Sequence, residues 1–179
     1  MRFVKFIPVL TFITAAFGPQ THAQGPPKPP WGFDAQSATP ISVPGEIRRI
    51  VGSDLEYDEA DPIKGVAVDL NGDGVDDYLL QSAPSLCGTG GCVYVLCDGA
   101  SRRKLGQFFG NPLYMHAERV HGYPTIATYS HQSADSGNYT TYSLDGKAYV
   151  VTSARAVQGT AVDRLFETLR RVPMWRRRP

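Results

Sequence analysis

The sequence predicts a mainly β protein: a single antiparallel β-sheet or meander domain with one C-terminal amphipathic helix. Short runs of β-branched and aromatic residues recur along most of the chain, and turn-forming residues separate them. The pairs Asp98-Gly99 and Asp145-Gly146 are typical of tight turns between antiparallel strands. A helical period of apolar residues is found only near the end of the chain. Together these three observations favour an antiparallel β fold.

Residues 1–23 have the pattern of a secretory signal peptide. Arg2 and Lys5 precede an apolar run, Phe6–Phe17, and a small-x-small ending closes at Ala23. The apolar run is too short to cross a bilayer as a helix, and no later run is long enough. We therefore expect cleavage after Ala23, no transmembrane segment, and a protein of the periplasm or the extracellular medium.

The charge balance excludes one class of partner. Cleavage after Ala23 removes two of the 18 basic residues, which leaves 16 basic residues against 17 acidic ones. A dedicated nucleic-acid-binding protein carries a strong positive field, which this chain lacks. The remaining length suits one domain of ordinary size.

Residues 24–45 are rich in proline and are expected to form an extended linker or arm. Trp31 and Phe33 offer apolar contacts that would pin part of this segment to the domain. The composition nevertheless favours a disordered leader.

The β domain is expected over residues 46–153. Its first strand is expected at Ile47–Val51, with Arg48 and Arg49 on the exposed side. Further strands follow along the chain: Gly65–Val68, Tyr78–Ser82, Val93–Leu96, Lys104–Phe109, Tyr114–Val120, Ile126–His131, Tyr139–Leu144 and Ala148–Thr152.

Residues 154–179 are expected to form the C-terminal helix and a basic tail. Apolar residues lie on one face of this helix and charged residues fill the other. The apolar set is Val162, Leu165, Phe166, Leu169 and Val172.

Two portions of the β domain resemble each other at a spacing of 47 to 48 residues. Residues 74–82 align with 122–130, and residues 95–99 align with 142–146. Each portion reads as strand, loop, strand and Asp-Gly turn. Identity is low, so chance similarity and duplication explain the pattern equally well.

The stretch Asp69–Asp77, which we call the acidic loop, has the pattern of a calcium-binding loop. Calcium binds six to eight oxygens from carboxylates, amides and backbone carbonyls. Alternate positions of the loop supply such donors: Asp69, Asn71, Asp73, the Val75 carbonyl and Asp77. The alternative is a metal-free hairpin whose Asp and Asn side chains cap their own backbone. Repulsion among the carboxylates favours calcium.

The acidic loop departs from the EF-hand in its second half. Leu80 stands where the EF-hand has a bidentate glutamate, and the flanking segments have the pattern of strands. The loop more closely resembles the FG-GAP (integrin-propeller, VCBS-type) repeat motif over Val66–Leu80. It is also similar to small exported bacterial proteins in which a Cys-Gly-x-Gly-Gly-Cys turn follows the loop. These resemblances imply a β fold, structural calcium and export.

The three cysteines lie close together. Across the glycine-rich turn, Cys87 and Cys92 are expected to form a disulfide, since export favours oxidation, and Cys97 is left as a thiol. A zinc site with His116 or His121 as fourth ligand is the alternative. The cysteine spacing matches no common zinc motif.

The sequence contains no assembled catalytic motif. Ser130-His131 and Asp135 are neighbours in sequence, whereas a catalytic triad is assembled from distant segments. The leading hypothesis is a calcium-stabilised, non-enzymatic domain that binds a protein or a glycan of the cell envelope through its loops. A periplasmic inhibitor or accessory protein, inserting a mobile loop at Gln132–Gly137, is the second. An undetected hydrolase is the third.

Overall fold

The computed structural model describes residues 29–175, which fold into two antiparallel sheets. Sheet I contains, in spatial order, β2 (Thr39–Pro40), β3 (Lys64–Val68), β4 (Asp77–Gln81), β5 (Cys92–Cys97) and β6 (Lys104–Gly110). Sheet II contains β1 (Trp31–Phe33), β7 (Leu113–Val120), β8 (Tyr123–Ser133), β9 (Ser136–Leu144) and β10 (Tyr149–Gln158). The predicted mainly β, antiparallel fold is confirmed, with its strands divided between two sheets.

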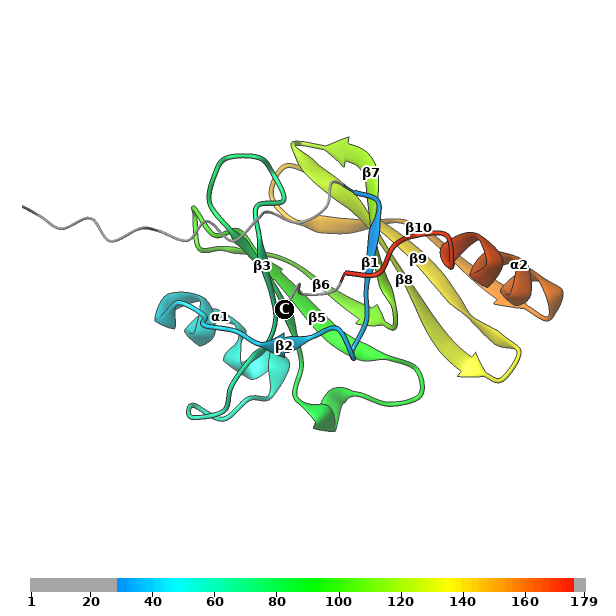
Figure 1. Ribbon diagram of the computed structural model, residues 1–179, viewed down its shortest axis with the longest axis horizontal. Helices are drawn as coiled ribbons and strands as arrows, with labels where there is room; N and C mark the ends of the chain where they lie inside the picture. The colour runs from blue at the N-terminus through cyan, green and yellow to red at the C-terminus, as the bar shows by residue number, and fades with distance from the viewer. Residues whose placement is uncertain (1–28, 176–179) are drawn as a thin grey trace, which may run out of the picture.

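The two helices lie outside the two sheets, so the domain has four layers (Figure 1). The main core lies between the sheets and includes Phe108 of β6 and Tyr149 of β10, whose rings meet edge to face. A second cluster packs α1 (Gly45–Leu55) on sheet I, and a third packs α2 (Thr160–Leu169) on sheet II. Every sheet face therefore has a packing partner over part of its area.

The strand predicted at Ile47–Val51 is wrong, because this segment lies within α1. Ile47, Val51 and Leu55 are spaced by four residues and are all buried. That spacing places them on one face of a helix, where they pack on Leu80 and other residues of sheet I. The intervening arginines lie off the buried face.

The proline-rich segment differs from the expected disordered leader. β1 pairs with β7, with Trp31 opposite Met115, and the side chains of Trp31 and Phe33 are 0% exposed. β2 pairs with β3. The arm therefore contributes one short strand to each sheet. Residues 24–28, like the expected signal peptide, lie outside the described residues.

The predicted C-terminal helix is confirmed as α2. Val162, Leu165 and Leu169 are buried against sheet II, and Phe166 is half-buried. The helix ends at Leu169, one turn earlier than the apolar pattern suggested. Within residues 29–175, no helix is long and apolar enough to span a membrane.

The two sheets share one topology. In each sheet four consecutive strands form a meander, and a short strand from the arm pairs with the first of them. β5 and β9 end at Cys97 and Leu144, and an Asp-Gly pair follows each. The 47- to 48-residue spacing seen in the sequence thus joins equivalent strands. Chance similarity and duplication both stay open as its explanation.

Candidate functional site

The acidic loop connects β3 to β4 and protrudes from one end of sheet I. Leu70 is only 2% exposed and anchors the loop in the main core, whereas residues 72–76 are exposed. The loop is therefore a hairpin connection, as its flanking sequence predicted. The side chains of Asp69 and Asn71 are partly exposed and that of Asp73 is exposed.

Hydrogen bonds within the loop turn its side-chain oxygens toward the backbone. Asp69 accepts hydrogen bonds from Gly72 N (2.6 Å) and Gly74 N (3.0 Å). Asn71 Oδ1 accepts from Asp73 N at 2.9 Å, and Asp73 Oδ1 accepts from Val75 N. Gly72 and Gly74 have φ values of 85° and 86°, a conformation that favours glycine. The sequence pattern thus specifies a tight, self-capped loop.

Asp77 lies in a different environment, at the base of the loop. It is 1% exposed; Oδ2 accepts from Leu70 N (3.0 Å), while Oδ1 accepts from Gly99 N (3.0 Å) and from the Tyr123 hydroxyl (3.1 Å). Burial raises the pKa of Asp77 to about 6, although these hydrogen bonds oppose the shift. Its carboxylate therefore holds the base of the loop together.

Tyr123 connects the loop across the two sheets. Its hydroxyl accepts a hydrogen bond from Asn71 Nδ2 (3.0 Å) and lies within hydrogen-bond distance of both Asp98 Oδ2 (2.9 Å) and Asp77 Oδ1 (3.1 Å). A hydroxyl has one proton and serves one of the two carboxylates at a time. Tyr123 belongs to sheet II and the other three residues to sheet I or its loops, so this network joins the sheets.

Asp98 completes the network, with a pKa shifted opposite to that of Asp77. Burial acts to raise the pKa of Asp98, but hydrogen bonds from Ser101 N and the Tyr123 hydroxyl outweigh it, and the pKa is lowered. Asp77 therefore holds its proton to higher pH than Asp98 does.

Arg119 also holds the acidic loop, through hydrogen bonds to backbone carbonyls. Its Nη1 donates to the carbonyl oxygens of Leu70 and Gly122, both at 2.6 Å. Sequence reasoning missed Arg119 and Tyr123 because both lie more than 40 residues from the loop in the chain. No local pattern marks them.

The donor set suits calcium in its chemistry. Carboxylate, amide and backbone carbonyl oxygens are all present among the five predicted ligands, Asp69, Asn71, Asp73, Val75 and Asp77. Within residues 29–175, no group of three or more His, Cys, Asp or Glu side chains is arranged to hold a metal. A calcium site here would therefore depend on Asn71 and the Val75 carbonyl as well as on the carboxylates.

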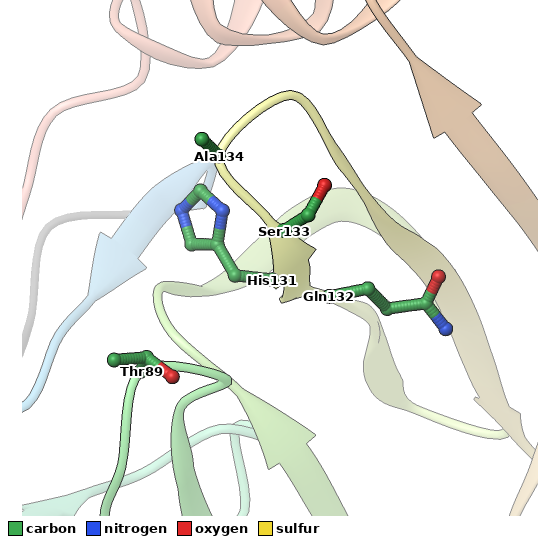
Figure 2. A pocket seen from close by; sticks show the side chains of 5 residues that line it. All are labelled: Thr89, His131, Gln132, Ser133 and Ala134. Atoms are coloured by element: carbon green, nitrogen blue, oxygen red, sulfur yellow. The ribbon is translucent and has the colours of Figure 1, made fainter.

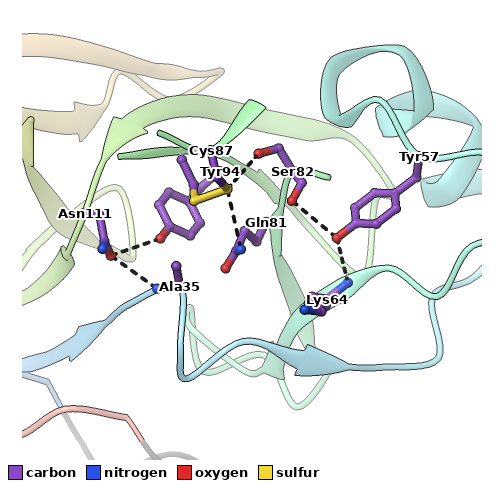
Figure 3. Close-up of a disulfide and its surroundings, with 9 residues drawn as sticks. Ala35, Tyr57, Lys64, Gln81, Ser82, Cys87, Tyr94 and Asn111 are labelled. Carbon is purple, nitrogen blue, oxygen red and sulfur yellow. Dashed lines mark hydrogen bonds between the residues drawn. A yellow bond between two sulfur atoms is a disulfide. The ribbon is translucent and has the colours of Figure 1, made fainter. Parts of the chain in front are cut away.

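The predicted disulfide between Cys87 and Cys92 is confirmed. It closes the turn after the short 3-10 helix Pro84–Leu86, and Gln81 Nε2 and Ser82 Oγ approach Cys87 Sγ at 3.8 and 3.7 Å (Figure 3). Both sulfurs are bonded, so the zinc alternative loses two thiolates. By loop entropy this short link stabilises the fold by about 2 kcal/mol. Cys97 is a buried free thiol, and burial raises its pKa to about 12.

The disulfide turn meets the β8–β9 hairpin at the end of the domain opposite the acidic loop. An open pocket of about 440 Å³ lies between them, lined by Thr89, His131, Gln132, Ser133 and Ala134. In Figure 2 the side chains of His131 and Gln132 point to opposite sides of the strand. The sequence predicted a mobile loop at Gln132–Gly137, but the structure has a two-residue turn between strands.

His131 packs within an aromatic cluster. Its ring stacks on Phe166 of α2 with centroids 6.1 Å apart, and it meets the edge of Tyr129 at 4.8 Å. Ser133 Oγ donates to Asp135 Oδ1 at 2.9 Å. Among the described residues, no side-chain hydrogen bond joins His131 to Ser130, Ser133 or Asp135, so these residues do not form a triad in this structure.

No family model matches the chain, and no curated protein or solved structure matches it either.

Proposed function

We propose that this protein is an exported, calcium-stabilised β domain that binds a protein or glycan of the cell envelope without catalysis. The observation that supports it is that the two ends of the domain differ in the residues they present. The acidic-loop end gathers oxygen donors on a loop that is fixed across both sheets. The opposite end presents exposed residues on a disulfide-closed turn and on a two-residue hairpin turn. The disulfide favours an oxidising compartment, in keeping with export.

Calcium in the acidic loop would have a structural role. Asp69, Asn71, Asp73, the Val75 carbonyl and Asp77 would hold the ion, and the ion would offset repulsion among their charges. The loop contacts Tyr123 and Arg119 of sheet II, so ordering it stabilises the contact between the sheets. These contacts support a structural role for a bound ion rather than a regulatory one.

Calcium is expected to raise the thermal stability of the protein. An ion that binds only the folded state at 100 times its dissociation constant adds about 2.7 kcal/mol. Thermal unfolding with calcium and with a calcium chelator measures this directly. The variant Asp73→Ala should unfold at the same temperature in both conditions.

Asp76→Ala is the matched control for this measurement. Asp76 is an exposed carboxylate of the same loop that is not among the proposed ligands. Its alanine variant should keep the calcium response. A wild-type protein that unfolds at the same temperature with calcium and with the chelator would refute the calcium proposal.

The proposed binding surface is the tip of the β8–β9 hairpin, residues 131–135, all exposed. Ser133 Oγ shares hydrogen bonds with Asp135 Oδ1 (2.9 Å) and Ser136 Oγ (2.7 Å), and Gly159 N donates to the Asp135 carbonyl (2.8 Å). A tip that is already ordered loses little conformational entropy when it binds a partner. Its rigidity supports a role in recognition.

The substitution Ala134→Arg is expected to abolish retention of a stoichiometric partner from a cell-envelope extract. A large charged side chain at the centre of an interface costs at least about 2 kcal/mol, or roughly thirtyfold in affinity. Ala117→Arg, at an exposed position of β7, introduces the same side chain elsewhere and should retain the partner. Equal retention by both variants would refute the hairpin tip as the surface.

An inhibitor of an envelope enzyme is the second candidate, and the shape of the same tip favours it. A narrow, exposed and rigid hairpin beside a disulfide-closed turn suits insertion into a concave active site. In that case the purified protein should inhibit a hydrolase of the extract stoichiometrically, and Ala134→Arg should relieve the inhibition. Retention of a partner without inhibition supports the binding domain alone.

A further inference from the structure

β10 is the open edge of the domain. It is ten residues long, it ends sheet II, and among residues 29–175 no further strand pairs with its outer side. Residues 150–156 are all exposed, and Val150 and Val151 are 42% and 57% exposed. An open edge of this length presents a row of unpaired backbone donors and acceptors to another strand.

The other three sheet edges are protected. β1 has three residues, and the C-terminal segment covers it through hydrogen bonds from Gly32 N to Pro173 O and from Trp175 N to Gly32 O. β2 has two residues and ends in a proline. β6 carries Lys104 at its start, and just past its end Asn111 N donates to Tyr129 O of β8 at 2.8 Å. Short length, proline, lysine and covering segments are the usual protections of a sheet edge, and within residues 29–175 β10 has none of them.

The charge pattern of β10 permits pairing with itself. Arg155 is its one charged residue, and the guanidinium lies 5.2 Å from the centre of the Tyr139 ring. Lysines, which commonly prevent edge-to-edge association, are absent from the strand. A second copy therefore meets an edge that is apolar or neutral along almost its whole length.

The alternation of side chains restricts the register of such a pairing. The stretch Ser153–Gln158 follows the irregularity between Val151 and Ser153 and is regular. In an antiparallel pair, opposing residues lie on the same face of the sheet, so a residue cannot oppose its immediate neighbour in the sequence. A two-fold axis between identical strands therefore passes through one residue, which opposes its own copy. An axis at Arg155 would oppose two arginines, whereas an axis at Ala154 places each Arg155 opposite Ser153 of the other copy.

We propose that two copies of this chain associate through antiparallel pairing of their β10 strands, centred on Ala154, to form a continuous ten-stranded sheet from the two five-stranded sheets II. The contact is isologous, as closed dimers require. It leaves the acidic loop and the β8–β9 tip unchanged in each copy.

Two substitutions at Ser153 test both the partner and the register. Ser153→Lys sets a lysine opposite Arg155 of the other copy, and Ser153→Glu sets a carboxylate there. Two new cross-strand ion pairs should tighten the dimer about tenfold, and the lysine variant should weaken it by a similar factor. Sedimentation equilibrium of the purified protein over a wide concentration range measures the dissociation constants.

Ala117→Lys, at an exposed position of the interior strand β7, is the charge control and should dimerise like the wild-type protein. Thermal unfolding confirms that each variant folds. The expected result is a concentration-dependent dimer that responds in opposite directions to lysine and glutamate at position 153. A protein that stays monomeric at every concentration, or a dimer that ignores both substitutions, would overturn the proposal.

Discussion

Replacement of Trp31 by alanine is expected to lower the free energy of unfolding by about 3 to 5 kcal/mol. Trp31 is 0% exposed in β1, and its ring packs against Trp175 with centroids 5.6 Å apart. The substitution would leave a large cavity in the main core and remove part of the contact that holds the C-terminal segment. Its indole N–H is buried with no partner among the described residues, which moderates the loss slightly.

Chemical denaturation followed by circular dichroism measures this loss. Gln36→Ala is the matched control, since Gln36 is an exposed residue of the same arm and its substitution should change stability by less than about 0.5 kcal/mol. In a Trp175→Phe background Trp31 is the sole tryptophan, and its emission should shift to longer wavelength on unfolding. A Trp31→Ala variant as stable as the control would place the arm outside the fold.

The arm shows where composition misleads. Prolines dominate residues 24–45 and favour an extended, solvated chain, yet a three-residue strand suffices to bury Trp31 and Phe33. The pairing partner of that strand, β7, lies some 80 residues later in the chain. A contact so distant leaves no periodic signal in the local sequence.

Most strands were predictable because their signals are local. The strand predictions from Gly65 to Thr152 overlap β3 to β10, since β-branched and aromatic runs between turn residues mark a pleated, half-buried segment. The division into two sheets was not predictable. The chain passes from one sheet to the other at residues 111–112, between β6 and β7. Because a turn within one sheet uses the same residue types, the sequence does not mark this change of sheet.

The helix α1 was not predicted, for a related reason. Only three of its eleven residues are fully buried, and a short window around Ile47 and Val51 resembles a strand beside two arginines. The third apolar residue, Leu55, extends the spacing of four and identifies the helix. A longer window would have separated the two interpretations.

The acidic loop was predicted in its local form, but not in its attachment. The loop is tight, as the spacing of Asp69, Asn71 and Asp73 predicted, and its hydrogen bonds are those of the metal-free alternative. Calcium in the loop stays a prediction. Asp77 was grouped with them as a fifth oxygen donor. In the fold it also supports the junction between the sheets, through Tyr123.

Replacement of Asp77 by alanine is expected to lower the free energy of unfolding by about 3 kcal/mol. The buried carboxyl accepts hydrogen bonds from Leu70 N, Gly99 N and the Tyr123 hydroxyl, and its loss leaves these donors without their partner. Each buried donor left unpaired costs about 1 to 3 kcal/mol. Denaturation in the presence of a calcium chelator measures the effect without any contribution from bound ion.

Tyr123→Phe separates the cross-sheet hydrogen bonds from the rest of the network. It removes the hydroxyl shared by Asp77 and Asp98 while the ring remains in the core. We expect a loss of about 1 to 2 kcal/mol, smaller than that of Asp77→Ala, because both backbone donors keep their acceptor. A loss as large as that of Asp77→Ala would place the main role of Asp77 in its contact with Tyr123.

The pH dependence of stability tests the protonation of Asp77 itself. Burial raises its pKa in the fold to about 6, against an ordinary value of 3.8. Between these values the unfolded chain releases the proton while the folded protein retains it, so the free energy of unfolding falls as pH rises, and it levels above about pH 6. Relative to Asp77→Asn, in chelator, the wild-type protein should therefore lose on the order of 2 kcal/mol between pH 4 and pH 7. Asp98, whose pKa is lowered, acts in the opposite sense at lower pH and is present in both proteins. A wild-type protein that instead gains stability over this range relative to Asp77→Asn would show that the pKa of Asp77 is lowered in the fold.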